Sequence, residues 1–549
     1  MHNFLDNEVE SIYATVLPIR QALLADAELN RQDILASNDS KLQAKSKPFI
    51  TVADGKMSQA VNATIEILKD HQNVFDLGEQ LVVIKDLSVQ PQNENLLAYW
   101  LGENIQFVIE KRVKKETVKE YIDPPVKLVK QLLSLGSQRG LKKLRGVISA
   151  PVLRKDGSLL RNPGYDSKTG LFLTEYCVKD FNVPDVLTQK EISCALKEVM
   201  FPFKDFTFAN DLDKELLLTA LLSAIMRPVL ATSPGFAIDA PYQASGKTLL
   251  ATAIASLMYP ETESPSVLPY IASKSDDENR KRLFAELLRG VKTIILDNVV
   301  GQFDSPALAA AMTSSSLTDR VLGESQTKTL PVNLLFLMTG NNVVLAGDMP
   351  RRIPIIRIDP KTPEPYKRRF DFDPVQYVKT NRIKLVAAGL TIVKAWLTSS
   401  DYKNGVYSIG SLASFEEWDS LVRQPVAWLA KHNWTWLKHD PMDAFDRAQK
   451  SDPEQEALYE LLVAVDAIYN GNVFSSRQLV DSVNSSGGSE SCTDLHDILV
   501  DWTNNKLNSR SIGRLLTYRK DRQVKDLVLR SVTKEGNKML WRVEKMVTS

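Results

Sequence analysis

The sequence predicts a multidomain α/β protein whose central part is a parallel β-sheet with helices on both faces. Short apolar runs alternate with helical segments between residues 236 and 339, which is typical of such a sheet. Turn residues separate short strands between residues 77 and 177, which predicts a small α+β region. A helix over Ser509–Tyr518 precedes two short strands, so a further small domain is expected at the end. The length of 549 residues suits two to four domains.

The elements follow in order along the chain. Residues 1–75 are polar and helical in pattern, for example Asn7–Leu29 and Lys56–Asp70, with a polar loop over Ala36–Ser46. Expected strands of the next region are Gln80–Lys85, Gln106–Lys111 and Glu116–Ile122, followed by a helix over Val126–Leu135. Amphipathic helices are expected at Leu187–Met200 and Asp211–Val229. The central sheet is predicted from strands Phe236–Asp239, Thr293–Asp297, Asn333–Thr339 and Ile353–Ile358, and from helices Lys247–Met258, Glu278–Leu288 and Arg382–Trp396. Residues 400–450 are rich in tryptophan and read as irregular. Helices Pro453–Tyr469, Ser475–Val483 and Ser509–Tyr518, and strands Leu527–Val532 and Met539–Val543, follow in the pattern of a winged helix.

Composition excludes several classes of protein. Apolar residues make up 44% and charged residues 25%, as in ordinary globular proteins. The three cysteines form no Cys-x-x-Cys pair, which argues against a zinc ribbon or disulfide framework and suits a reducing cytoplasm. No apolar run is long enough to span a bilayer, and the N-terminus lacks a signal pattern. We therefore expect a cytoplasmic protein without a membrane partner. Because the net charge is +1, any surface for nucleic acid must be local.

The strongest motif is Ala240–Thr248 (APYQASGKT), between an expected strand and an expected helix. A phosphate-binding loop needs backbone N–H groups, a helix N-terminus aimed at the anion, a lysine for the outer phosphates and a hydroxyl for Mg²⁺. Gly246, Lys247 and Thr248 supply these last parts, although Pro241 stands where a first glycine is usual. A chance Gly-Lys-Thr turn is the alternative. The residues expected to hold ATP are Pro241, Ala244, Ser245, Gly246, Lys247, Thr248 and Leu249.

An acidic residue should lie on a neighbouring strand to orient the metal ion. Val291–Asn298 (VKTIILDN) is a β-branched run that reaches Asp297, which we expect to hold Mg²⁺ together with Thr248. A glutamate that activates water often follows such an aspartate, but Asn298 stands there. Glu278 is therefore our candidate base, with Glu286 behind it. A strand-end or capping role for Asp297, and a solvated first-turn position for Glu278, are the alternatives.

Two later segments carry polar groups suited to the outer phosphate. Leu334–Asn342 (LLFLMTGNN) is an apolar strand that ends in amides and can place Asn341 beside the γ-phosphate, with a plain Gly-Asn turn as the alternative. Arg351 and Arg352 follow Asp348. Guanidinium groups stabilise charge on a transferring phosphoryl group, often across a subunit boundary. Either arginine is a candidate for this role, and a structural ion pair is the alternative.

Basic residues predict where nucleic acid binds. Arg320–Pro331 (RVLGESQTKTLP) reads as a hairpin with Lys328 near its tip, which can grip DNA phosphates or be an ordinary surface hairpin. Residues 111–145 hold eleven Lys/Arg against three acidic residues, and residues 506–545 hold twelve against four. Such clusters favour nucleic acid, with a solvated face as the alternative. The residues assigned to DNA are Lys328, Arg320, Lys114, Lys115, Lys142 and Lys143.

The order of these segments resembles the AAA+ helicases of superfamily 3, and more narrowly the replicative ATPases and primase-helicases of bacteriophages, prophages and other mobile elements. The family also has an asparagine after its acidic strand. The resemblance spans roughly residues 140–430. It is carried by Arg145–Val152, Asp156-Gly157, Gly164-Tyr165-Asp166, Gly170-Leu171, Glu278-x-Arg280-Lys281, Leu296-Asp297-Asn298, Arg320-x-Leu322-Gly323, Thr339–Asn342, Gly347-Asp348 with Arg351-Arg352, and Ser414-Phe415-Glu416-x-Trp418.

This resemblance implies an AAA+ P-loop core and a replicative DNA helicase that works as a hexameric ring in the host cytoplasm. ATP and Mg²⁺ would bind at subunit interfaces, and single-stranded or forked DNA would pass through the ring, with a primase or polymerase as a candidate partner. The resemblance does not extend to a primase, because no acidic triad or zinc motif precedes the core. The residues expected to act in catalysis are Lys247, Asp297, Asn341, Arg351, Arg352 and Glu278.

Six regions and two rival functions follow. The regions are an N-terminal helical region (1–75), an α+β DNA-binding or accessory domain (76–180), a helical collar (181–230), the AAA+ motor (231–400), a linker (401–450) and a winged-helix domain (451–549). The first rival is an ATP-switched origin-binding initiator or helicase loader, which would not displace a strand from forked DNA. The second is an AAA+ protein remodeller, whose ATPase would not respond to DNA.

Overall fold

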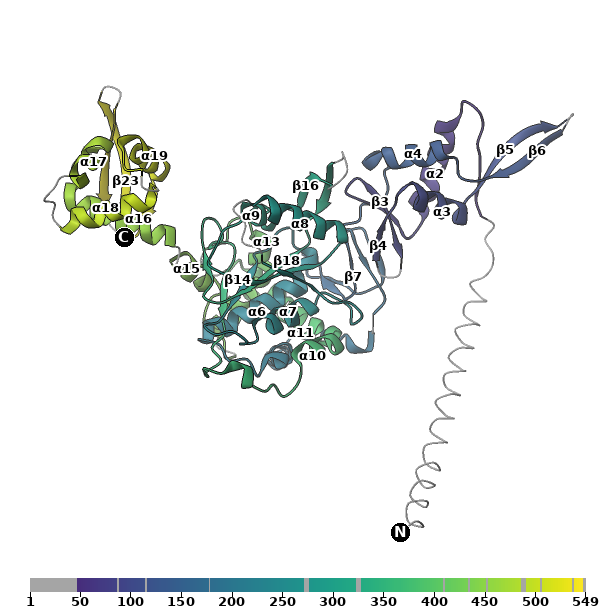
Figure 1. Cartoon of the computed structure of the whole chain (residues 1–549). Coiled ribbons are helices and arrows are strands. Elements are labelled where there is room, and N and C mark those ends of the chain that lie inside the picture. Colours follow the sequence, from purple (N-terminus) through teal and green to yellow (C-terminus); the bar gives the residue numbers. More distant parts are fainter. Residues whose placement is uncertain are drawn as a thin grey trace, which may run out of the picture. The chain divides into compact units, whose positions relative to one another are not determined.

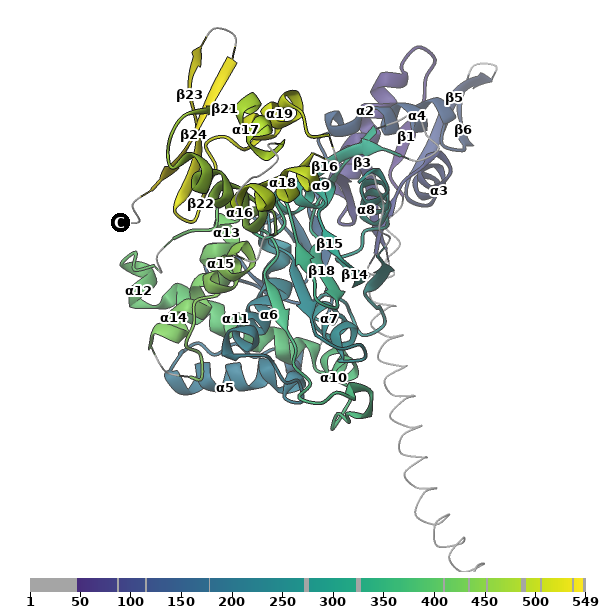
Figure 2. The ribbon, with the colours of Figure 1, turned by 60° about the vertical axis from the view of Figure 1, so that its left-hand side comes forward.

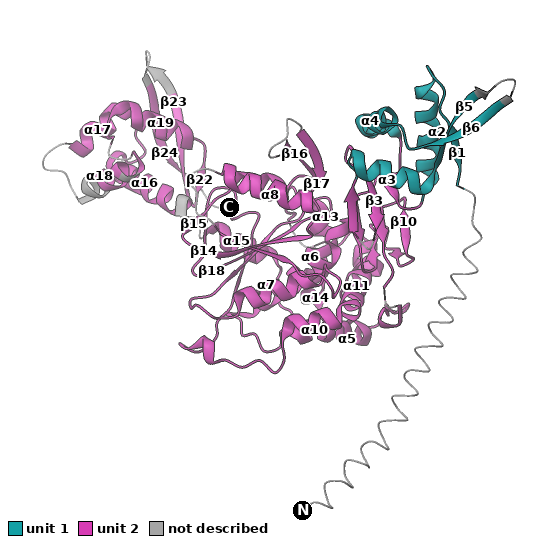
Figure 3. Cartoon of the chain, turned by 45° about the vertical axis from the view of Figure 1, so that its right-hand side comes forward, with its two compact units in different colours: residues 1–71, 92–139 teal, residues 72–91, 140–549 magenta. Residues whose placement is uncertain are grey.

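Two compact units make up the structure, which is a computed structural model. The first unit contains described residues 47–71 and 92–139, and the second contains residues 72–91 and the described residues from 140 onward (Figure 3). Residues are described over 47–85, 88–113, 116–176, 178–270, 276–321, 327–407, 410–432, 435–450, 453–484, 490–503, 506–535 and 538–546. The predicted helix Asn7–Leu29, the loop Ala36–Ser46 and the residues Lys114 and Lys115 lie outside them. None of the described helices combines the length and the apolar character that crossing a membrane requires.

The first unit is a small α+β fold. Its sheet consists of β1 (Phe49–Thr51), β5 (Gln106–Val113) and β6 (Glu116–Ile122), in which β1 pairs parallel to β5 and β6 pairs antiparallel to it. Its helices are α2 (Met57–Asp70), α3 (Glu94–Asn104) and α4 (Val126–Ser134). The helix predicted at Lys56–Asp70 is thus confirmed, and its apolar side chains are buried along one face, as the helical spacing requires.

Small sheets begin the second unit. Their strands are β2 (Val74–Leu77), β3 (Gln80–Lys85), β4 (Ser88–Pro91), β7 (Gly146–Ile148), β8 (Val152–Leu153), β9 (Leu159–Leu160), β10 (Gly164–Asp166) and β11 (Leu171–Leu173). Phe75 of β2 packs against Tyr165 and Phe172, with ring centroids 5.1 and 5.9 Å away. The β2–β3 turn contains Gly78, and a Cβ there would lie 2.4 Å from the carbonyl oxygen of Thr329, so only glycine fits.

A five-stranded parallel sheet forms the centre of the second unit, which confirms the predicted βα alternation. Its strands, in spatial order, are β13 (Ser266–Pro269), β14 (Thr293–Val299), β18 (Leu335–Gly340), β12 (Phe236–Asp239) and β20 (Ile355–Arg357). Because all five run the same way, their carboxyl ends meet at one edge, where ligands of open α/β sheets bind. The strand β18 lies between β12 and β14, so the segments of the candidate site come from three adjacent strands.

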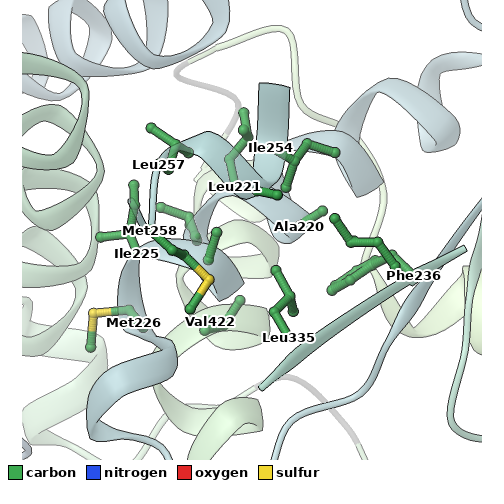
Figure 4. Close-up of a cluster of buried hydrophobic side chains, with 14 of the residues drawn as sticks. Ala220, Leu221, Ile225, Met226, Phe236, Ile254, Leu257, Met258, Leu335 and Val422 are labelled. Atoms are coloured by element: carbon green, nitrogen blue, oxygen red, sulfur yellow. The ribbon is translucent and has the colours of Figure 1, made fainter. Parts of the chain in front are cut away.

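Helices cover both faces of this sheet (Figure 1). One side carries α8 (Asp277–Arg289) and α9 (Pro306–Met312), and the other carries α7 (Lys247–Ser256), α10 (Pro374–Thr380) and α11 (Arg382–Thr398). Apolar side chains of α6 (Asp211–Met226) and α7 meet Phe236 of β12 and Leu335 of β18 in the core (Figure 4). Short strands β15 (Gln302–Phe303) and β19 (Val344–Leu345) pair beside the sheet, and β16 (Ser316–Arg320) and β17 (Thr327–Pro331) form a hairpin.

The two helices before the central sheet differ in burial. The helix α5 (Gln189–Met200) is amphipathic as predicted, because Ile192, Leu196 and Val199 are buried along one face. The prediction of an amphipathic α6 was wrong, since every residue from Leu216 to Met226 is buried. Glu215 is also buried, and its carboxylate accepts backbone N–H groups of Lys438 and His439 at 2.7 and 2.9 Å. The helix therefore belongs to the core of the second unit.

The tryptophan-rich segment after α11 is helical where described, so the expectation of irregular structure was wrong. Its elements are α12 (Ser400–Lys403), α13 (Glu416–Trp418), a π-helical turn (Asp419–Arg423), α14 (Gln424–His432) and α15 (Met442–Lys450). The Trp418 side chain is fully buried, and its indole N–H donates to the Ser223 hydroxyl at 2.8 Å. Because these helices are short and packed on several sides, no single apolar stripe marks them in the sequence.

The end of α7 is tied to the start of β14 by one phenol. The Tyr259 hydroxyl accepts the backbone N–H groups of Lys292 and Thr293 at 2.8 and 2.9 Å. Since α7 begins at the phosphate-binding loop and β14 reaches Asp297, this contact fixes the spacing of two parts of the candidate site. The Lys292 ammonium lies 5.3 Å from the centroid of the same ring, and burial lowers its pKa to about 8.

Replacing Lys292 with methionine is expected to stabilise the fold at neutral pH. The folded chain loses this proton near pH 8, whereas an exposed lysine loses it near pH 10.5. Between these two pH values the unfolded chain therefore binds more protons, and the free energy of unfolding rises with pH. Lys292→Met should raise Tm at pH 7 by on the order of 2–4 °C, and its advantage should shrink towards pH 10. Thermal unfolding at both pH values measures this. Lys281→Met, at an exposed position of α8, is the control, and a Tm below that of the parent at pH 7 would contradict the argument.

The C-terminal residues form a domain with its own core (Figure 2). Its helices are α16 (Pro453–Tyr469), α17 (Ser476–Asn484), α18 (Glu490–Trp502) and α19 (Ser509–Arg519), and its strands are β21 (Phe474–Ser475), β22 (Gln523–Val524), β23 (Leu527–Glu535) and β24 (Lys538–Lys545). The strands pair antiparallel in the order β21-β24-β23-β22. Leu462, Leu499, Leu516 and Trp541 are buried at its centre.

Candidate nucleotide-binding and metal site

The loop predicted to bind phosphate connects β12 to α7 at the carboxyl edge of the sheet. Ala244 and Gly246 have φ angles of 56° and 88°, so the loop curls through the left-handed region twice. A Cβ at Gly246 would lie 3.2 Å from a ring atom of Phe206, so this position also favours glycine by packing. Lys247, Thr248 and Leu249 then form the first turn of α7, whose N–H groups and positive dipole end suit an anion.

The ammonium group of Lys247 lies inside the loop. It donates to the Tyr242 carbonyl at 3.0 Å, and the Ser245 hydroxyl donates to the same oxygen at 2.6 Å. The residue is 9% exposed. Burial lowers the pKa of Lys247, while the nearby carboxylates of Asp239 and Asp297 raise it. A triphosphate in the loop would add negative charge and favour the protonated lysine.

Asp297 brings the loop and the acidic strand together, as the sequence predicted. Its Oδ1 atom accepts the hydroxyl groups of Thr248 at 2.7 Å and Thr339 at 2.6 Å. Thr339 in turn accepts the backbone N–H of Asn298 at 3.1 Å. A register shift in the pairing of β14 with β18 between Leu296 and Val299, with φ of 61° at Asn298, places these groups. A threonine hydroxyl beside an aspartate is the pair that holds Mg²⁺ in P-loop nucleotide hydrolases.

A second carboxylate, which the sequence reasoning missed, anchors the loop after β18. Asp239 ends β12 and is buried, and its Oδ1 accepts the Val343 N–H at 3.1 Å. Burial raises the pKa of Asp239 despite its backbone hydrogen bonds. A Cβ at Gly340 would lie 2.5 Å from the Val299 carbonyl, so the loop also presses on β14. Asn341 therefore sits on a loop held by both neighbouring strands and is half-buried there.

The two candidate arginines occupy different environments. Both guanidinium groups bind Asp348 of the same chain. Arg352 is 7% exposed and also donates to the Ala309 carbonyl at 2.9 Å, so its contacts are internal to the subunit. The Arg351 side chain is 46% exposed. The structural ion pair that was the alternative thus describes both arginines, since each binds Asp348, and they differ in that Arg351 is the more exposed of the two.

In the described part of the chain, neither candidate glutamate shares a hydrogen-bond partner with Asp297. Glu278 lies exposed in the first turn of α8, and among the described residues it makes no hydrogen bond or ion pair. Glu286 is buried and accepts from the Arg289 guanidinium at 2.8 and 3.0 Å, which describes a structural ion pair. Of the two, only Glu278 has a carboxylate open to solvent.

The predicted hairpin is present but begins earlier than expected. Its first strand runs from Ser316 to Arg320, and residues 322–326 at its tip lie outside the described residues. Lys328 pairs opposite Asp319 and is half-buried on the same face as Leu330, whereas Arg320 is exposed. Asp319 also accepts from Arg280 of α8 at 3.1 Å. The hairpin is thus braced against α8, with Arg320 presented outward.

Two of the other lysines assigned to DNA lie beside the small sheets. The carbonyl groups of Lys142 and Lys143 accept the Asp76 N–H and the Tyr165 hydroxyl, each at 3.0 Å. Their backbone is therefore fixed, and both residues are exposed.

Aromatic side chains beside the loop are a further feature that sequence reasoning missed. Phe206 and Phe370 pack with ring centroids 5.0 Å apart, and both come within 4 Å of a Cβ built at Gly246. The Arg368 guanidinium lies 5.2 Å from the Phe370 centroid. Since these residues come from distant parts of the chain, no local sequence pattern predicts that they lie beside the loop.

Several solved structures resemble this chain, but all with low TM-scores. No protein-family model matches the chain, and no curated protein matches it. The apo structure of the NrS-1 C-terminal region is 13% identical, covers 89% of this chain and 99% of its own, and has a TM-score of 0.36. The structure of SCCmec type IV Cch, described as an active helicase, is 11% identical over 85% of this chain and 90% of its own, with a TM-score of 0.33. An inhibitor-bound JCV helicase structure is 14% identical over 45% and 61%, with a TM-score of 0.21. At these TM-scores the likenesses carry no argument about function.

Proposed function

We propose that this protein is an ATP-dependent replicative DNA helicase of a phage or other mobile element, acting as a hexameric ring. The observation that carries the proposal is the contact of Thr248 and Thr339 with one oxygen of Asp297. It joins a phosphate-binding loop, an acidic strand and the strand between them, which is the arrangement that nucleotide hydrolysis needs. Two further observations support a helicase in particular, namely the order of the motifs in the sequence and the hairpin that is braced against α8.

The roles of the residues follow from their places at the sheet edge. Lys247 holds the outer phosphates, with Pro241, Ala244, Ser245 and Gly246 shaping the loop. Thr248 and Asp297 would hold Mg²⁺, which when bound neutralises charge on the phosphates. Asn341 aligns water beside the γ-phosphate, and Arg351 completes the site of a neighbouring subunit. Glu278 is the candidate that takes the proton from water.

DNA is assigned to the hairpin and to exposed basic residues. Arg320 and Lys328 would contact phosphates of a strand in the central pore, and hydrolysis would move this hairpin. The proposal also assigns Lys114, Lys115, Lys142 and Lys143 to the DNA path. The collar region 181–230 would support ring formation, and the C-terminal domain is assigned a winged-helix role.

The proposal is tested by strand displacement on forked DNA with the purified full chain, ATP and Mg²⁺. Displacement that needs ATP is expected. ATP hydrolysis without displacement would favour the initiator or loader, and hydrolysis that DNA does not stimulate would favour the protein remodeller. Absence of ATP hydrolysis with and without DNA would overturn all three.

Replacing both hairpin cations should separate hydrolysis from unwinding. Arg320→Ala/Lys328→Ala removes two phosphate contacts, so we expect unwinding to fall at least about tenfold while ATPase without DNA stays within twofold. The matched control is Lys197→Ala/Lys281→Ala, which removes the same charge from exposed positions of α5 and α8. Equal unwinding by both double variants would show that the hairpin does not grip DNA.

A further inference from the structure

The C-terminal domain contains a groove along one face of α19. Its volume is about 960 Å³, and it is bordered by the start of α17, by α19 and by β24. Gly513 lies at the middle of the α19 face, where a Cβ would come 3.3 Å from the Ser476 hydroxyl. The close approach of α17 and α19 at this glycine shapes the groove.

Positive charge dominates the groove. Arg477, Arg510 and Arg514 line it and no carboxylate does, although Arg477 forms an ion pair with Asp481 at 3.9 Å. Arg510 and Arg514 are exposed and form no ion pair with any residue that the structure describes. They are four residues apart on α19, so both project from the same helix face. The hydroxyl groups of Ser476 and Ser509 border the groove as well and can donate to phosphate oxygens.

Aromatic and apolar groups complete the lining. The Tyr518 side chain is 75% exposed at the end of the α19 face, and the Arg522 guanidinium lies 5.8 Å from its ring centroid, so most of the ring surface is available for stacking. Trp541 and Met539 of β24 also line the groove. Trp541 is 1% exposed, and its indole N–H has no hydrogen-bond partner among the described residues. Because the indole nitrogen has almost no exposed surface, Trp541 contributes packing beneath the groove and not an accessible donor.

We propose that this groove binds single-stranded DNA without any need for nucleotide. Unpaired arginines, hydroxyl donors and an open aromatic ring form the combination that binds single strands through phosphates and base stacking. Duplex readers instead insert a convex helix into a major groove about 12 Å wide. Here the basic face of α19 is one wall of a concavity, which admits one strand. The choice of DNA as occupant rests on the proposed function.

The test measures fluorescence anisotropy of a labelled twenty-nucleotide oligo-dT with the full chain and no nucleotide. Arg510→Ala/Arg514→Ala should weaken binding at least about tenfold and lower the slope of log K against log salt by about 1.4, at roughly 0.7 for each lost phosphate contact. Lys506→Ala/Lys520→Ala, which removes two exposed charges outside the groove, should cost less than threefold. Equal effects of the two double variants, or none from the first, would overturn the proposal.

Two further measurements keep the site distinct from the motor and from a duplex reader. ATP hydrolysis without DNA should be unchanged in Arg510→Ala/Arg514→Ala. A failure of the proposed ATPase can therefore be distinguished from a failure of the groove to bind the oligonucleotide. A blunt duplex of the same length should compete at least about tenfold more weakly than oligo-dT, and stronger competition by duplex would overturn the choice of a single strand. With the unaltered protein, a bromouracil oligonucleotide should crosslink to Tyr518, whose side chain is exposed, and crosslinks found only elsewhere would also overturn the proposal.

Discussion

The variant Lys247→Ala is expected to lower the rate of ATP hydrolysis at least about a hundredfold, with or without DNA. The ammonium group lies inside the phosphate-binding loop, where it donates to the Tyr242 carbonyl at 3.0 Å. Alanine removes the loop cation that we propose to contact the outer phosphates in the transition state, and loss of a single preorganised donor of this kind costs about 10²–10³ in rate. Release of inorganic phosphate at saturating ATP measures the effect.

Binding and folding controls separate this effect from general damage. Lys197→Ala removes an exposed lysine of α5 and should keep the parent rate. Adding ATP and Mg²⁺ should raise the Tm of the parent and of Lys197→Ala, but raise it much less in Lys247→Ala, because binding to the folded state is weakened. A Lys247→Ala protein that hydrolyses ATP within threefold of the parent would refute the phosphate-binding role.

Replacing Asp297 with asparagine is the second change with a large expected effect. The amide keeps the shape and can still accept from Thr248 and Thr339, but it lacks the negative charge that attracts Mg²⁺. We expect hydrolysis to fall at least about a hundredfold and the Mg²⁺ concentration for half-maximal activity to rise. Titration of activity with Mg²⁺ measures both.

The same variant should still bind nucleotide when metal is chelated. Affinity for a fluorescent ATP analogue in EDTA should stay within about twofold of the parent, since Asp297 acts through the metal. Asp443→Asn, at an exposed position of α15, is the matched control and should change neither quantity. Unaltered Mg²⁺ dependence of Asp297→Asn would move the metal assignment to another carboxylate.

Local sequence patterns predicted much of the central sheet and the principal contact of the site. Phe236–Asp239 is a strand, Lys247 begins a helix, and Asp297 meets Thr248. These features could be predicted because each depends on a short run of residues whose apolar spacing and turn chemistry are visible in the chain.

Features that depend on distant contacts could not be predicted in this way. Thr339 and Asp239 act through partners 42 and 104 residues away. The sequence could not show that Arg352, unlike Arg351, is buried and donates to the Ala309 carbonyl, because this contact joins residues 43 positions apart. The burial of α6 also depends on what surrounds it, because a helix that is apolar all round carries no stripe to reveal its contacts.

The turn at Gly78 has a mechanical consequence. Because a Cβ there would lie 2.4 Å from the Thr329 carbonyl, no slack separates the β2–β3 turn from the second strand of the hairpin. Any movement of Thr329 towards that turn would therefore displace β2 and β3 as well. If hydrolysis moves the hairpin as proposed, the sheet β2-β3-β4 is therefore expected to move with it.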